Sequence, residues 1–179
     1  GGNDLQMPCM VLDEMQKRMR WDESVQFIGY WELGDSLKMD GGEPEKIVCS
    51  VYHRPAMKDT KGKMTPAWLM LAPMNNTDAN VTVTLRPNLK IFGLEGLGNG
   101  RLLDLYRATP FTFAPKNGWK ANGDDPESPY IVIKPTEEFF PMSGGAAQIT
   151  IPKRNFRALL LLGANELPDL APPSAPYTW

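Results

Sequence analysis

Carboxylates are the side chains of this sequence that could most directly do chemistry. Hydrolysis of a glycosidic bond requires two of them across a cleft, one acting as acid and the other as base or nucleophile. The candidates are Glu32, Asp35, Glu137 and Glu138. Glu137 and Glu138 are adjacent, so on a strand their side chains would point to opposite faces. Spacing alone places no pair across a gap, and solvated charges near turns are the expected interpretation.

His53, the single histidine of the chain, is the second candidate for chemistry. Cys49 lies four residues earlier, but a zinc site needs several nitrogen or sulfur ligands and the sequence offers no third or fourth partner. A Ser-His-Asp relay would have to use His53, and no Gly-x-Ser-x-Gly turn is present. We therefore expect a structural histidine, no metal site and no catalytic residue in this chain.

The segment 93–100 contains four glycines and invites comparison with a phosphate-binding loop. Such loops deliver backbone N–H groups at the start of a helix and end in Lys-Ser or Lys-Thr. The segment does not end in Lys-Ser or Lys-Thr, and no helical pattern follows it. We expect a flexible loop between strands and no bound cofactor.

Aromatic side chains suggest sugar contact, because a pyranose presents an apolar C–H face to an exposed ring. Trp119 lies in the polar segment 116–129, a predicted long loop, and is the best candidate for an exposed platform. Its polar neighbours Asn117, Asn122 and Asp124 complete the candidate carbohydrate-binding set. Packing of Trp119 to anchor the loop is the competing interpretation.

Composition restricts the classes of partner. The chain has 179 residues, 42% of them hydrophobic, and a net charge of −2. Nucleic acid is not an expected partner, because phosphate binding needs clustered Lys and Arg. No apolar run approaches the roughly 20 residues that span a membrane. Cys9 and Cys49 are expected to be reduced and buried rather than joined in a disulfide.

The elements that must position these residues are one helix and a series of strands. Residues 4–20 are predicted to be helical, because apolar side chains recur there at spacings of three and four. These side chains are Leu5, Cys9, Leu12, Met15 and Met19. The tail 168–179 is rich in proline and is expected to lie extended on the surface.

Strand signals follow from residue 26 onward. The clearest alternation is at 80–86, where Val81, Val83 and Leu85 are predicted to face inward. Residues 55–66 are expected to form an exposed hairpin connection. The predicted strands are 36–39, 46–53, 67–74, 80–86, 101–106, 130–134, 146–151 and 156–162.

Short strands separated by turns, without alternating helices, predict a mainly β protein. We expect an antiparallel β-sandwich of about seven or eight strands with one N-terminal helix. The expected organisation is a helix in 1–24, the sandwich in 25–163 and a proline-rich tail in 164–179.

The order of several short blocks resembles a known family. They are Phe27-Ile-Gly-Tyr-Trp31-Glu, Val-Tyr-His-Arg-Pro55, Trp68-Leu-Met-Leu-Ala, Val81-Thr-Val-Thr-Leu, Asp104-Leu-Tyr106 and Ile149-Thr-Ile-Pro-Lys-Arg-Asn-Phe-Arg157. This order resembles the C-terminal β-sandwich domain of bacterial glycoside hydrolases, most closely the glycoside hydrolase 123-like group. The resemblance covers residues 25–163.

The resemblance implies a non-catalytic accessory role, since the catalytic carboxylates of that family lie in a barrel domain that this segment lacks. The implied partner is the barrel of the same parent chain, with Phe27, Tyr30 and Trp31 at the interface. A carbohydrate-binding module that uses Trp119 on a polysaccharide is the second interpretation. A small enzyme that uses Glu137 or Glu138 is the third.

Overall fold

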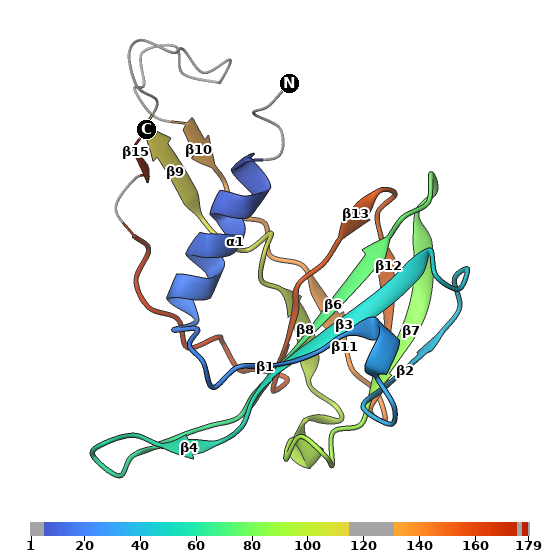
Figure 1. Ribbon diagram of the computed structural model, residues 1–179, viewed down its shortest axis with the longest axis horizontal. Helices are drawn as coiled ribbons and strands as arrows, with labels where there is room; N and C mark the ends of the chain where they lie inside the picture. Colours follow the sequence, from blue (N-terminus) through green and yellow to red (C-terminus); the bar gives the residue numbers. More distant parts are fainter. Residues whose placement is uncertain (1–5, 115–130, 175–176, 179) are drawn as a thin grey trace. The chain divides into compact units, whose positions relative to one another are not determined.

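The computed structural model describes residues 6–114, 131–174 and 177–178 (Figure 1). The chain forms two compact units. The sandwich unit consists of Asp22–Leu105 and Glu138–Pro168, and the helical unit consists of Gly1–Trp21, Tyr106–Glu137 and Asp169–Trp179. The described chain is mainly β with one α-helix, as the sequence predicts. Residues 106–137 group with the helix, which differs from the continuous 25–163 domain expected from the sequence.

The larger sheet of the sandwich unit has the strand order β1-β3-β6-β14-β8-β11, and every neighbouring pair is antiparallel. The short strand β13 also pairs with β6. β14, which comes last in sequence, lies between β6 and β8 and is buried along its whole length. The bounds are β1 Gln26–Ile28, β3 Ile47–Arg54, β6 Trp68–Asn75, β8 Arg101–Asp104, β11 Phe139–Pro141, β13 Asn155–Phe156 and β14 Leu159–Leu162.

The smaller sheet has the order β12-β7-β2, again antiparallel, with β12 at Ala147–Ile151, β7 at Val81–Pro87 and β2 at Leu37–Asp40. Its alternation confirms the sequence prediction: Val83 and Leu85 are buried, and Val81 packs against the same core. On the outer face, Thr82 Oγ1 and Thr150 Oγ1 are 2.9 Å apart and share a hydrogen bond.

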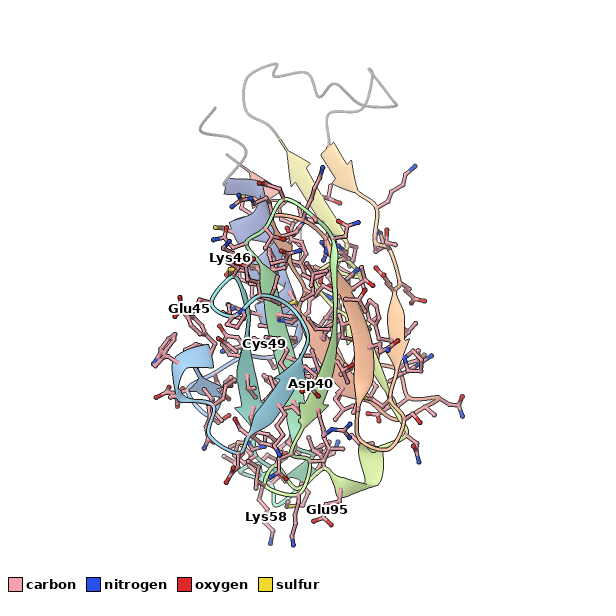
Figure 2. All side chains as sticks on the ribbon, turned by 90° about the vertical axis from the view of Figure 1, so that its right-hand side faces the viewer. Asp40, Glu45, Lys46, Cys49, Lys58 and Glu95 are labelled. Atoms are coloured by element: carbon pink, nitrogen blue, oxygen red, sulfur yellow. The ribbon has the colours of Figure 1, made fainter. Side chains whose placement is uncertain are left out.

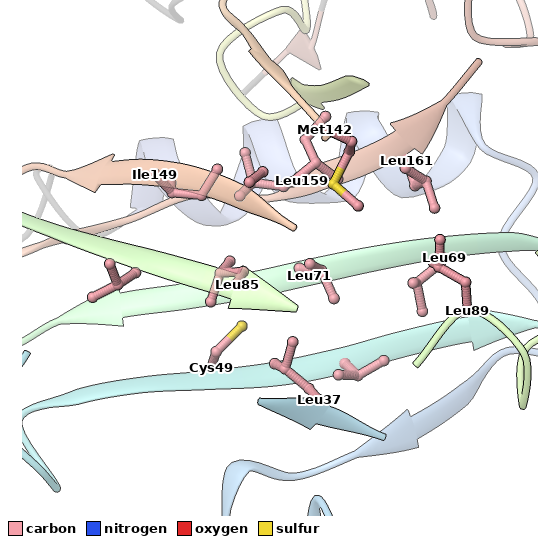
Figure 3. Close-up of a cluster of buried hydrophobic side chains, with 14 of the residues drawn as sticks. Leu37, Cys49, Leu69, Leu71, Leu85, Leu89, Met142, Ile149, Leu159 and Leu161 are labelled. Atoms are coloured by element: carbon pink, nitrogen blue, oxygen red, sulfur yellow. The ribbon is translucent and has the colours of Figure 1, made fainter. Parts of the chain in front are cut away.

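The core of the sandwich unit lies between these two sheets (Figure 3). Four of its side chains are each 0% exposed: Leu71 and Leu159 of the larger sheet, and Leu85 and Ile149 of the smaller sheet. Full burial of one such side chain contributes about 1.5–3 kcal/mol. Together these contacts confirm the antiparallel β-sandwich.

Cys49 projects into this core, and burial raises the pKa of its thiol to about 12. The thiol is therefore protonated at neutral pH and inert as a nucleophile. Both cysteines are free, but Cys9 on the helix is exposed. The expectation that both thiols are buried is thus wrong for Cys9.

The strand predicted over 156–162 is interrupted in the structure. β13 ends at Phe156 and β14 begins at Leu159, although the pairing register with β6 is the same on both sides of the gap. The N–H of Arg157 donates to the carbonyl of Pro73 at 3.0 Å. Pro73 has no N–H to return the bond, so the ladder breaks opposite it.

Arg157, at this break, joins the two sheets through its side chain. Its Nη1 lies 2.9 Å from Asp104 Oδ2 and 2.9 Å from Glu138 Oε2, and its Nη2 donates to Glu138 Oε1 at 3.2 Å. Its Nε donates to the carbonyl of Thr150 on β12 at 2.6 Å. Asp104 is 0% and Arg157 is 5% exposed at the side chain. Buried charges require such compensation, because desolvation is costly.

A two-stranded hairpin, β4 (Met57–Lys58) with β5 (Met64–Thr65), connects β3 to β6. It confirms the hairpin expected in residues 55–66. Short 3₁₀ turns follow β1 and precede β8, at Tyr30–Glu32 and Glu95–Leu97.

The helical unit contains α1 (Gln6–Arg18), β9 (Phe111–Ala114), β10 (Ile131–Ile133) and β15 (Tyr177–Thr178). β10 pairs antiparallel and β15 parallel with β9. The buried face of α1 includes Val11, Glu14 and Met15, and Met19 just after the helix is buried as well. Met15 and Met19 therefore confirm part of the apolar stripe expected from the sequence, whereas Cys9 is exposed and Leu12 is half-buried.

The C-terminal tail is hydrogen-bonded to α1. The N–H of Ala171 donates to the Arg18 carbonyl at 2.7 Å, and Arg18 Nε donates back to the Ala171 carbonyl at 3.0 Å. The N–H of Ser174 donates to Glu14 Oε1 at 2.8 Å. The tail is therefore fixed by the helix rather than simply laid over the surface.

Removing the Arg157 guanidinium should destabilise the sandwich strongly. Arg157→Met leaves two carboxylates and a carbonyl without their cation, and loss of one partner of a buried pair costs about 3–5 kcal/mol. Arg154→Met is the matched control, because the Arg154–Asp78 pair is exposed and screened by solvent, so its loss should cost little stability. Urea unfolding of both variants measures the difference, and equal losses would refute this role of Arg157.

Candidate functional site

An exposed group of aromatic side chains lies at the β1 edge of the larger sheet. We call Phe27, Tyr30, Trp31 and Tyr52 the aromatic patch. Phe27 is 46%, Tyr30 49% and Trp31 67% exposed. All three side chains are thus at the surface, and their role at an interface stays a prediction.

The rings of the aromatic patch touch one another. Phe27 and Tyr52 are directly opposite in the β1–β3 register, and their ring centroids are 4.9 Å apart. The Trp31 ring stands edge-on to Phe27 at 6.0 Å and to Tyr30 at 5.1 Å. Such T-shaped contacts suit the aromatic quadrupole and hold the cluster together.

Gly29 sets the position of Trp31. A Cβ atom added at Gly29 would lie 2.5 Å from Trp31 Cζ2, so the indole ring rests directly on the glycine backbone. The φ of Gly29 is −67°, which any residue can adopt. The glycine is thus required by the close approach of the ring and not by its backbone conformation.

Hydrogen bonds keep the turn that carries Tyr30 and Trp31 in place. The Tyr30 N–H donates to Ser50 Oγ of β3 at 3.1 Å. The Glu32 N–H donates to the Gly29 carbonyl at 2.9 Å, and the Gly29 N–H donates to Glu32 Oε1 at 3.3 Å. Glu32, a candidate carboxylate in the sequence, therefore caps this turn.

A polar group lies farther along the outer side of β3. Arg54 Nη2 is 2.9 Å from Asp22 Oδ2, and Arg54 Nε donates to Ser24 Oγ at 3.0 Å. Hydrogen bonds from the Ser24 hydroxyl and N–H, with a smaller contribution from Arg54, lower the pKa of Asp22. This carboxylate is therefore charged at neutral pH.

The other candidate carboxylates do not form a facing pair in the structure. Glu138 is bound by the Arg157 guanidinium, and Glu137 belongs to the helical unit. Asp35 lies at the start of the smaller sheet and lines the groove described below.

His53 faces the sandwich interior at the end of β3. It is 8% exposed, and its ring centroid is 4.8 Å from that of Phe92. One ring nitrogen is hydrogen-bonded to the Phe92 backbone, whereas Nε2 has no partner among the described residues. Burial lowers the pKa of His53, partly offset by the Phe92 hydrogen bond. The described residues contain no group of three or more His, Cys, Asp or Glu that could hold a metal.

The predicted sugar platform cannot be placed. Trp119, Asn117, Asn122 and Asp124 all lie outside the described residues. No helix within the described parts of the chain has the length and apolar character needed to cross a bilayer.

A polar groove of about 590 Å³, which the sequence did not predict, opens at one end of the sandwich unit. Figure 2 labels one of its residues, Glu95, in the 3₁₀ turn at this end. The glycine-rich segment and the turn at 144–145 lie side by side in its lining, and Asn99 Oδ1 accepts a hydrogen bond from the Gly144 N–H at 3.1 Å. The lining residues are Asp35, Lys38, Arg86, Pro87, Asn88, Leu89, Glu95, Gly98, Asn99, Gly144 and Gly145.

The chain matches no protein-family model, and comparison with curated proteins and with solved structures returned no similar protein. The resemblance to the accessory domain of glycoside hydrolases therefore stays a prediction.

The buried His53 should make stability depend on pH. The unfolded chain has the ordinary histidine pKa of 6.5, and the folded chain has a lower one. Below pH 6.5 the unfolded state therefore takes up the proton first, and the free energy of unfolding falls by up to about 1.4 kcal/mol per pH unit. His53→Gln should flatten this slope between pH 7 and 5.5. Equal slopes in urea titrations of the two proteins would contradict the assignment.

Proposed function

We propose that this chain is a non-catalytic accessory β-sandwich module of a larger carbohydrate-processing protein. Its aromatic patch docks onto the catalytic domain of the parent chain and stabilises it. The observation that carries the proposal is the cluster of Phe27, Tyr30 and Trp31, each about half or more exposed and held in a fixed arrangement. Large aromatic side chains are enriched at protein interfaces and often supply most of the binding energy.

The angles between the rings favour a protein partner over a flat polysaccharide surface. Trp31 is inclined by 65° to Phe27 and by 85° to Tyr30. A flat carbohydrate surface could stack on only one of these rings at a time, because stacking requires parallel faces. A protruding cluster with differently oriented rings instead suits apolar pockets in a protein surface.

The surroundings of the patch also suit a domain interface. Interfaces surround a buried apolar centre with a polar rim. Arg54 and Asp22 supply charged groups on the same strand side, and Ser50 and Glu32 are already used to fix the turn. The patch therefore has few unsatisfied polar groups to desolvate when it is covered.

A carbohydrate-binding module is the second candidate, favoured by the exposed Trp31 ring. In that case Trp31, alone or with the predicted Trp119 platform, would stack on single sugar units. The two candidates differ in whether the Trp31 ring contacts protein or sugar in the native polypeptide.

Photo-crosslinking in the native parent polypeptide tests the proposal. A photoreactive phenylalanine at position 31 should crosslink to peptides from outside these 179 residues. Ile91, which is 55% exposed, is the control position and should give no such product. A native polypeptide of only 20.0 kDa, or a parent without crosslinks from position 31, would overturn the docking role.

Two substitutions should weaken docking to different extents. Trp31→Ala should weaken the association by about 30-fold, equivalent to about 2 kcal/mol, as for an interface hot spot. Gly29→Ala keeps every aromatic ring but displaces the indole, so it should weaken docking less than Trp31→Ala. Calorimetric titration of the module against the rest of the parent chain gives these values. Docking unaffected by both substitutions would contradict the assignment of this surface.

A further inference from the structure

We propose that the polar groove of the sandwich unit binds an acidic sugar, a polyhydroxylated ligand with one carboxylate. The groove is built by the start of β2, the end of β7, the glycine-rich segment and the turn between β11 and β12. Its volume of about 590 Å³ lies within the usual range of about 300–1,000 Å³ for small-ligand sites.

Two cations of the groove stand directly opposite each other. Lys38 on β2 is paired in register with Arg86 on β7, and both side chains are exposed on the outer face. Directly opposed residues have Cβ atoms about 5 Å apart, and like charges in such pairs are destabilising. No carboxylate among the described residues lies within ion-pairing distance of either cation. Among the described residues, the one hydrogen bond that either side chain makes is a long contact of 3.5 Å from Arg86 Nη1 to the Gly144 carbonyl.

This arrangement calls for an external anion. Arg54, Arg154 and Arg157 of the sandwich unit each pair with an acidic side chain, whereas Lys38 and Arg86 have no such partner among the described residues. Lys38 and Arg86 instead border an open groove. A ligand carboxylate between them would relieve the repulsion and gain charge-assisted hydrogen bonds.

The remaining groove residues indicate which chemical groups the ligand should carry besides its carboxylate. Asp35 and Glu95 are hydrogen-bond acceptors, Asn88 and Asn99 carry amides, and none of these four side chains is in an ion pair among the described residues. Two carboxylates would repel a phosphate or a polyanion, but they accept hydrogen bonds from hydroxyl groups. One negative charge together with several hydroxyls matches a uronic acid unit of an oligosaccharide.

Two glycines of the groove border open space. A Cβ atom added at Gly144 or Gly145 would meet nothing within 4 Å. Pro87 and Leu89 add apolar surface to the same groove. Acid, amide, cation and apolar contacts are thus available within one site.

The choice of a sugar rests on the proposed carbohydrate context, whereas the anion site rests on the groove alone. The groove residues are distinct from those of the aromatic patch, so the two proposals fail separately. Trp31→Ala should weaken docking as stated above and leave acidic-sugar binding unchanged.

The test is a titration of the 179-residue chain with galacturonate, which carries one carboxylate, followed by NMR and calorimetry. The matched ligand is its methyl ester, which keeps the ring and hydroxyls and loses the charge. We expect galacturonate to bind at least tenfold more tightly than the ester. Lys38→Gln and Arg86→Gln should each reduce affinity about tenfold or more, and Lys58→Gln on the β4–β5 hairpin should not.

Asp35→Asn distinguishes a sugar site from a simple anion site. If Asp35 accepts a ligand hydroxyl, the variant should bind galacturonate more weakly. If the groove only attracts negative charge, the variant should bind galacturonate more tightly, and sulfate should compete equally well. Tighter binding by the variant, equal binding of the methyl ester, or no saturable binding at millimolar galacturonate would overturn the proposal.

Measuring the stability of the variants distinguishes a loss of binding from a loss of folding. Without ligand at low salt, Arg86→Gln relieves the cross-strand repulsion and should raise the unfolding midpoint by about 1–3 °C. A variant that is more stable and yet binds less tightly has lost the site and not the fold. A lower midpoint would contradict the unpaired repulsion on which the inference depends.

Discussion

The sandwich unit depends on one buried cation. Arg157 lies at the interruption of its own strand, bonded to two carboxylates of the larger sheet and to a carbonyl of the smaller one. The apolar side chains between the sheets attract without direction. A guanidinium with fixed donor geometry instead specifies which strand faces which, so Arg157 sets the alignment of β12 over β8. Pro73 contributes by ending the ladder where the side chain turns inward.

This fixed sandwich provides two different surfaces. The edge formed by β1 carries rigid aromatic rings above a glycine, and the loop end of β2 and β7 carries opposed cations beside an open groove. Each surface has a local cost, apolar exposure in the first and like-charge repulsion in the second. The buried core and Arg157 stabilise the fold, so it can tolerate both costs. Local destabilisation of this kind is common at functional surfaces.

The sequence predicted local features well and long-range ones poorly. The alternation at 80–86 correctly placed Val83 and Leu85 in the core. The groove could not be predicted, because it requires knowing that Lys38 stands opposite Arg86, some fifty residues away. The grouping of residues 106–137 with the helix likewise depends on pairings between distant segments.

The position of β14 has a consequence for synthesis on the ribosome. This strand, four buried leucines at 159–162, separates β6 from β8, so neither can complete the larger sheet before it arrives. Until residues 159–162 are synthesised, the chain therefore carries two partial sheets whose inner edges are unpaired. Open edges of this kind pair readily with other chains. The strand order thus makes association with other chains a hazard of the period before β14 is complete.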